Sequence, residues 1–137
     1  MERWLGLWSE HCYAGLRIVA GLLFLCHGTQ KLFGVPGGRG VVGSPLLQTA
    51  GVIELVAGAL IALGLYTTYA AFLASGEMAF AYFSVHIWNG FWPIVNRGEL
   101  AVLFCFLFLF LASRGAGHLS LDRLRGGACP EGGKAGG

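Results

Sequence analysis

Long apolar runs occupy most of this 137-residue chain, and they limit the folds that it can adopt. The runs cover residues 12–33, 46–65, 69–87 and 98–113. A helix needs about 20 mainly apolar residues to cross the hydrocarbon core of a bilayer. Charged residues make up 12% of the chain, whereas a soluble domain has about 25%. The sequence therefore predicts an all-α membrane protein with four spans.

The connections between these runs are short. Residues 34–45 hold a Gly/Pro cluster, residues 66–68 separate the second run from the third, and residues 89–97 contain a Trp-Pro pair. Helices joined by such short loops pack as antiparallel neighbours. We therefore expect one domain, residues 1–125, folded as an antiparallel four-helix transmembrane bundle. The Gly-rich residues 126–137 are expected to be disordered.

The distribution of basic residues predicts how the bundle is oriented. Four spans place both termini on one side of the membrane. That side holds Arg3, Arg114, Arg123, Arg125 and Lys134, and the opposite side holds Lys31, Arg39 and Arg97. Because Lys and Arg are enriched in cytoplasmic loops, both termini are expected in the cytoplasm, with the chain in the inner (plasma) membrane. The basic residues form no cluster of the kind that binds nucleic acid.

Ionisable residues lie inside the apolar runs, and they mark the place to seek a function. They are Glu54, Glu77, Glu99, Arg17, His27, Lys31 and His86. A charge at the centre of a spanning helix costs about 2.5–3.5 kcal/mol on translocon scales. Gly51 and Gly58 flank Glu54 on one helical stripe, and small residues at this spacing allow close helix packing in lipid. The charges are therefore expected to point into the bundle.

The helical rise of about 1.5 Å per residue sorts these side chains by depth. The expected outer layer holds Lys31, His86 and Glu99, the expected inner layer holds Arg17, Glu54 and Glu77, and His27 lies between them. Lys31 is expected to pair with Glu99. Two interpretations stay open: an ion-pair network that fixes helix register, or a pocket whose acids and histidines exchange protons beside a small ligand.

Common cofactor and metal motifs are absent from the sequence. It has no dinucleotide-binding glycine motif, no P-loop, no haem C-x-x-C-H and no Cys/His zinc spacing. A haem bound by His27 and His86 would be geometrically possible, but no other haem signal accompanies them. The cysteines form no C-x-x-C pair, so neither a metal site nor a disulfide framework is expected.

Four short motifs, taken together, resemble the DoxX family of small four-span membrane proteins. They are HGTQKLFG at residues 27–34, GVIELVAG at 51–58, NRGELA at 96–101 and GHLSLD at 117–122. The similarity extends over about residues 15–122. The motif positions carried over are Arg17, His27, Gly28, Lys31, Glu54 and Glu99. Arg97 departs from the family pattern, which often has a second glycine there.

The resemblance implies a prokaryotic inner-membrane subunit of an oxidoreductase system, coupled to quinone through sulfur (thiosulfate) oxidation or through oxidative-stress defence. On this reading Glu54, His27 and Lys31 bind the quinone carbonyls and relay protons. Arg17, Glu77, His86 and Glu99 line the same pocket. No covalent cofactor is expected, and the electron donor would be a partner subunit. The alternatives are a non-enzymatic scaffold or assembly subunit, which could also form a homo-oligomer, and a small proton or solute pathway.

Overall fold

The computed structural model describes residues 6–37, 40 and 44–125, and every regular element within them is helical. The long helices are α2 (Ser9–Phe33), α3 (Pro45–Leu63), α4 (Thr67–Ala81) and α6 (Glu99–Arg114). The shorter elements are the π-helical η1 (Tyr82–His86), the 3-10 turn η2 (Ile87–Asn89), α5 (Pro93–Asn96) and α7 (Leu121–Leu124). The tail expected to be disordered, residues 126–137, lies outside the described residues.

The helix ends follow the turn residues in the sequence. Pro45 begins α3, at a position where its missing N–H costs nothing. Gly34 and Gly64 end α2 and α3 in the left-handed conformation that glycine adopts without strain. The first helix begins at Ser9, three residues before the predicted start. The third apolar run stays helical through η1 and η2 as far as Asn89.

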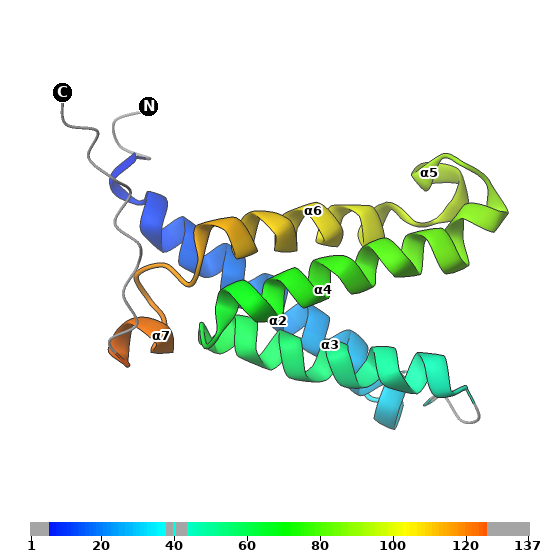
Figure 1. The fold of residues 1–137 in the computed structure, drawn as a ribbon, viewed down its shortest axis with the longest axis horizontal. Coiled ribbons are helices and arrows are strands. Elements are labelled where there is room, and N and C mark those ends of the chain that lie inside the picture. The colour runs from blue at the N-terminus through cyan, green and yellow to red at the C-terminus, as the bar shows by residue number, and fades with distance from the viewer. Residues whose placement is uncertain (1–5, 38–39, 41–43, 126–137) are drawn as a thin grey trace.

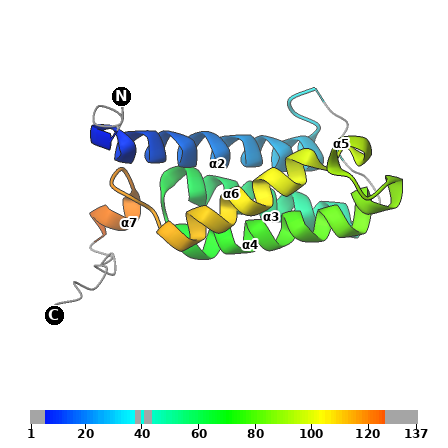
Figure 2. The same ribbon diagram turned by 90° about the horizontal axis from the view of Figure 1, so that it is seen from above.

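Glycines set the contact between α2 and α3, which lie side by side (Figures 1 and 2). A Cβ atom on Gly21 would lie 2.5 Å from the backbone nitrogen of Ala62, and one on Gly28 would lie 2.5 Å from that of Leu55. The two backbones therefore touch, as small residues permit in membrane helices. The order of these contacts runs in opposite directions along the two helices, so the pair is antiparallel.

The second pair consists of α4 and α6, which also run antiparallel. The Ser75 hydroxyl donates a 2.8 Å hydrogen bond to the backbone carbonyl of Cys105, in the middle of both helices. Gly98, just before α6, packs on the Tyr82 ring beyond the end of α4, and Gly115, just after α6, lies near Thr68 at the start of α4. The molecule is therefore built from two antiparallel helix pairs.

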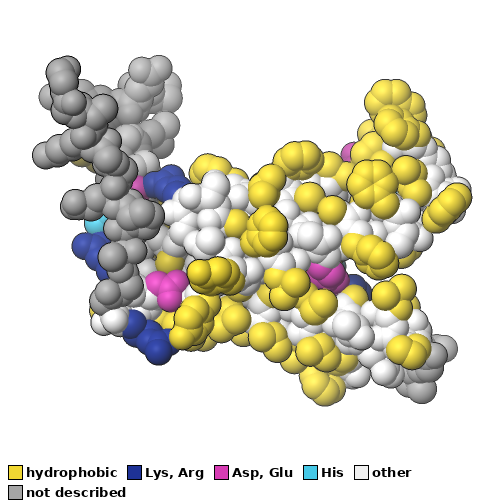
Figure 3. All heavy atoms as spheres, in the orientation of Figure 1, with side chains coloured by type: hydrophobic (Ala, Val, Ile, Leu, Met, Phe, Trp, Pro, Cys, Tyr) yellow, Lys and Arg dark blue, Asp and Glu magenta, His cyan; other side chains and the backbone are white. Residues whose placement is uncertain are grey.

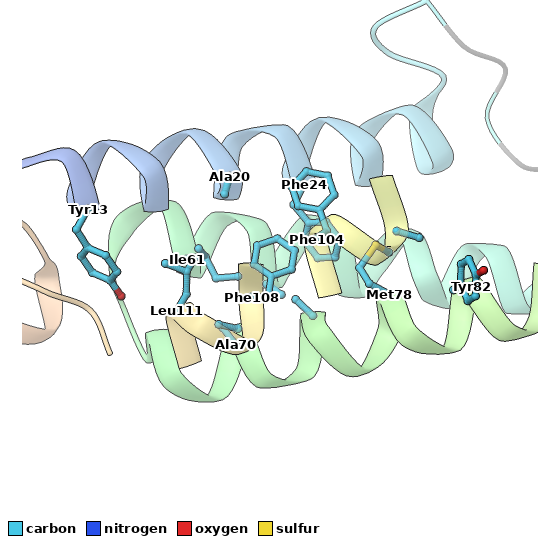
Figure 4. Packing of buried hydrophobic residues seen from close by; sticks show 14 residues of the cluster. Tyr13, Ala20, Phe24, Ile61, Ala70, Met78, Tyr82, Phe104, Phe108 and Leu111 are labelled. Carbon is cyan, nitrogen blue, oxygen red and sulfur yellow. The ribbon is translucent and has the colours of Figure 1, made fainter. Parts of the chain in front are cut away.

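Aromatic side chains join the two pairs into one core. Phe24 from α2 and Phe108 from α6 are fully buried, and their ring centroids are 4.7 Å apart. Phe104 stacks on Phe108 at 5.2 Å, and Ile61 from α3 is also fully buried. Figure 4 shows these side chains gathered between the helices. Most of the other core residues are alanines, including Ala57, Ala71, Ala74 and Ala101.

The outer surface is apolar, as a lipid-facing surface must be. Phe72 and Phe106 are about two-thirds exposed, and Figure 3 shows hydrophobic side chains spread over much of the visible face. Three helices are long and apolar enough to cross a membrane: Ser9–Phe33, Pro45–Leu63 and Thr67–Asn89. At 16 residues, α6 is shorter than these three. The all-helical membrane class is thus supported, and a bundle of four spans stays a prediction.

Candidate functional site

An ion pair between α2 and α3 forms the centre of the candidate site. The Lys31 Nζ atom lies 2.7 Å from Glu54 Oε1. The Glu54 side chain is 3% exposed and that of Lys31 is 28% exposed, so the acid is buried and the base reaches the surface. The glycine contact produces this geometry: a Cβ atom on Gly51 would lie 3.1 Å from Lys31 Cβ, so the two helices are close enough for a direct pair.

The expected pair between Lys31 and Glu99 is wrong. Glu99 is exposed at the start of α6, and it forms no ion pair with any residue that the structure describes. The prediction assumed that the first and last helices stay adjacent along their whole length. In the structure the two helix pairs diverge toward the end that carries α5 (Figure 1), and α6 begins there beside α4.

A second acid, Glu77 on α4, belongs to the same group. It interacts electrostatically with both Glu54 and Lys31. The Oε2 atoms of Glu54 and Glu77 are buried, and neither has a hydrogen-bond partner among the described residues. A buried acceptor without a partner is costly, so such atoms call for an explanation. The prediction that Glu54 and Glu77 lie in one layer agrees with this placement.

His27 lies one helical turn before Lys31. Its ring is half-buried and packs against Phe104 on α6 in a T-shaped arrangement, with 6.3 Å between the ring centroids. Figure 3 shows a notch in the surface where the two helix pairs diverge, with acidic and basic side chains together at its base. The lysine, the two acids and the histidine form what we call the notch site: His27, Lys31, Glu54 and Glu77.

Arg17 does not share a layer with the acids, which corrects the prediction. Its Nη1 donates to the carbonyls of Ile61 at 2.6 Å and Ala62 at 3.0 Å, and its Nη2 donates to the carbonyl of Leu119. The residue is 1% exposed. A guanidinium at this position satisfies the free carbonyls at the C-terminal end of α3. Arg17 therefore ties α2, α3 and the segment after α6 together.

Sequence reasoning missed how the segment after α6 is used. Asp122 accepts hydrogen bonds from the backbone nitrogens of Tyr66 at 2.9 Å and Thr67 at 3.1 Å, which caps the N-terminus of α4. The Tyr13 hydroxyl donates to the carbonyl of Gly115 at 2.5 Å. The GHLSLD motif thus has a structural role: its Asp122 fastens the segment after α6 to the turn between α3 and α4.

His86 contacts the loop between α4 and α6, and it forms no ion pair with a described acid. It belongs to η1, where its Nδ1 is 3.2 Å from the Asn96 carbonyl oxygen and its ring stacks on Tyr82. Asn96, which is 4% exposed, donates to the carbonyl of Gly90 at 2.7 Å and accepts from the Gly98 nitrogen at 2.7 Å. These bonds shape the loop between α4 and α6. The buried Asn96 was a further residue that the sequence did not single out.

Metal ligation has no candidate in the described part of the chain, which contains no group of three or more His, Cys, Asp or Glu side chains suited to an ion. Cys12, Cys26 and Cys105 are free thiols.

The fold and the notch site define a small helical membrane protein with a charged group between its helices. The profile of the DoxX family matches residues 13–87, more than half of the chain, and the chain belongs to this family. An uncharacterized protein of Haemophilus influenzae is 50% identical over 116 residues, which cover 80% of this chain and 87% of that protein. No solved structure matches the chain.

Proposed function

We propose that this protein is a membrane subunit of a quinone-linked oxidoreductase system, and that the notch site binds the quinone head group. The proposal places all four long helices across the bilayer, with both termini in the cytoplasm. Residues 100–113 in α6 have no charged side chain, so this helix can enter the hydrocarbon region even though it is short. A ligand dissolved in the lipid could then reach the notch from the side.

The observation that carries the proposal is the incomplete pairing of the notch site. Lys31 pairs with one oxygen of Glu54, while the second oxygen of Glu54 and one oxygen of Glu77 are buried without hydrogen-bond partners. An ion pair that fixes helix register accounts for Lys31 and one oxygen of Glu54, but it gives no role to Glu77. A second unsatisfied acid in lipid is expensive, and a polar ligand in the notch offers a reason for it.

The residues present suit a quinone. Its carbonyl oxygens need hydrogen-bond donors, which the Lys31 ammonium and the His27 ring provide beside the apolar Phe104. A quinone supplies two-electron, two-proton redox chemistry when bound. Reduction requires protons at the carbonyl oxygens, and carboxyl and imidazole groups within reach can supply them as general acids.

Each residue of the notch site then has a definite task. Lys31 is held by Glu54 but stays partly exposed, so its remaining N–H groups can bind a carbonyl oxygen. Glu54 keeps Lys31 in position, and an acid of the notch site passes protons toward the ligand. In this proposal, the electrons come from a partner subunit.

A second candidate function is a scaffold or assembly subunit without chemistry of its own. The hydrogen bonds of Arg17 favour it, since this buried residue links three segments through its two Nη groups, while its buried Nε has no hydrogen-bond partner among the described residues. On this reading the Lys31–Glu54 pair fixes the register of α2 on α3, and the protein acts by binding other subunits.

Gentle purification from native membranes separates the two functions. The proposal expects quinone and a partner subunit to copurify with the wild-type protein, and expects quinone to be lost from Lys31→Met. Glu99→Gln is the matched control, because this exposed acid lies outside the notch site and its loss should leave the quinone content unchanged. A partner that copurifies with no quinone would favour the scaffold.

A further inference from the structure

The notch site carries one more acid than base. Glu54 from α3 and Glu77 from α4 face Lys31 from α2. His27, also from α2, forms no ion pair with a described acid, and its ring packs against Phe104 in a T-shaped arrangement. The α6 stretch of residues 100–113 adds no charged side chain. With both acids ionised, the group would hold one uncompensated negative charge.

The geometry decides which acid would hold a neutralising proton. Glu54 Oε1 is 2.7 Å from the Lys31 ammonium, an arrangement that stabilises the ionised carboxylate. Glu77 has no ion-pair partner within 4 Å among the described residues, and its buried Oε2 has no hydrogen-bond donor. Burial without a partner disfavours a charged carboxylate far more than a neutral carboxylic acid.

We infer that Glu77 carries a proton at neutral pH, and that it is the group of the notch site that exchanges protons with the ligand. The second half of this inference rests on the proposed function, and the first half does not. In one exchange, Glu77 gives its proton to a ligand oxygen and becomes a carboxylate, while the electrons come from the partner subunit. Water at the open side of the notch then returns a proton to Glu77. Glu54 stays the ionised partner of Lys31 throughout.

Infrared spectroscopy of the purified protein tests the inference directly. A protonated carboxylic acid has a carbonyl stretch that is well separated from the bands of carboxylates, and the stretch shifts when the acid proton is exchanged for deuterium. The wild-type protein at neutral pH should show this band. Glu77→Gln should remove it, whereas Glu99→Gln should leave it unchanged because Glu99 is exposed and lies outside the notch site.

Two further variants test the charge balance without relying on Glu77→Gln. In Glu54→Gln, Lys31 loses its partner, so Glu77 should ionise to replace it and the band should disappear. In Lys31→Met, both acids lose their base, so both should be protonated and the band should grow about twofold. His27→Asn should leave the band as it is.

Clear outcomes would overturn the inference. The first is a wild-type spectrum without the band, and the second is a band of wild-type strength in Glu77→Gln. The third is a stronger band in His27→Asn, which would mean that a positively charged His27 imidazole balances the second acid. Quinone content is measured on the same samples. If the protein binds no quinone but still shows a band that depends on Glu77, the conclusion that Glu77 is protonated would stand. Only the proposed quinone function, and the proton exchange that rests on it, would be contradicted.

Discussion

At the scale of single residues, the ion pair between Lys31 and Glu54 is the centre of the candidate site. Glu54 and Lys31 stand out because charges are costly in apolar runs. Their pairing depends on how the helices are arranged in space, and the divergence of the two helix pairs separates Lys31 from Glu99. The predicted position of Arg17 came from its depth along the helix alone. Depth does not reveal that the guanidinium donates hydrogen bonds to backbone carbonyls of α3.

A double-mutant cycle tests the Lys31–Glu54 pair. Lys31→Met and Glu54→Gln should each lower stability, because removing one partner of a buried pair costs about 3–5 kcal/mol in soluble proteins. The double variant should lose much less than the sum, measured from thermal unfolding in detergent. The control cycle combines Lys31→Met with Glu99→Gln and should be additive. Additive losses for Lys31 and Glu54 would contradict the pair.

Arg97 offers a second residue-scale prediction. Its φ angle of 59° lies in the left-handed region, which glycine adopts without strain. A side chain in this conformation costs about 1–2 kcal/mol, and the greater freedom of unfolded glycine offsets part of that. Arg97→Gly should therefore raise the thermal midpoint slightly. Arg97→Ala removes the same charge and keeps the strained angle, so an equal rise in both variants would show that charge is the cause.

At the scale of elements, the stripe of glycines in the sequence correctly predicts the close face of α3. The π-helical turn of η1 and the short α5 were not predicted, because apolar periodicity does not reveal a change in hydrogen-bond register. The buried Asn96 that organises this loop resembles an ordinary turn residue when only the sequence is read.

The α2–α3 contact can be tested with glycine substitutions. In Gly28→Ala the new Cβ would lie 2.5 Å from the Leu55 backbone, which forces the helices apart. Overpacking of this kind costs about 1–3 kcal/mol, so the thermal midpoint should fall. Gly15→Ala is the control: it lies in the same helix with nothing within 4 Å of its Cβ, and alanine favours helix. If both variants change the thermal midpoint equally, close backbone contact does not hold α2 and α3 together.

At the scale of the whole molecule, orientation in the membrane remains a prediction from the Lys/Arg distribution. Both ends of the described chain, the start of α2 and α7, lie at one end of the molecule (Figure 1), which suits two termini on one side. An alkaline phosphatase fusion at Gly137 should be inactive, and one in the loop of residues 37–43 should be active. An active fusion at Gly137 would place the termini outside and overturn the topology.

The central claim is that a quinone head group binds at the notch site. A photoreactive quinone analogue, added to membranes and activated by light, should label peptides that contain residues 24–31 and 77, and excess natural quinone should suppress the labelling. Lys31→Met should lose this labelling, while Glu99→Gln should keep it. Labelling that natural quinone does not suppress, or that falls only on lipid-facing residues such as Phe72 and Phe106, would contradict the claim.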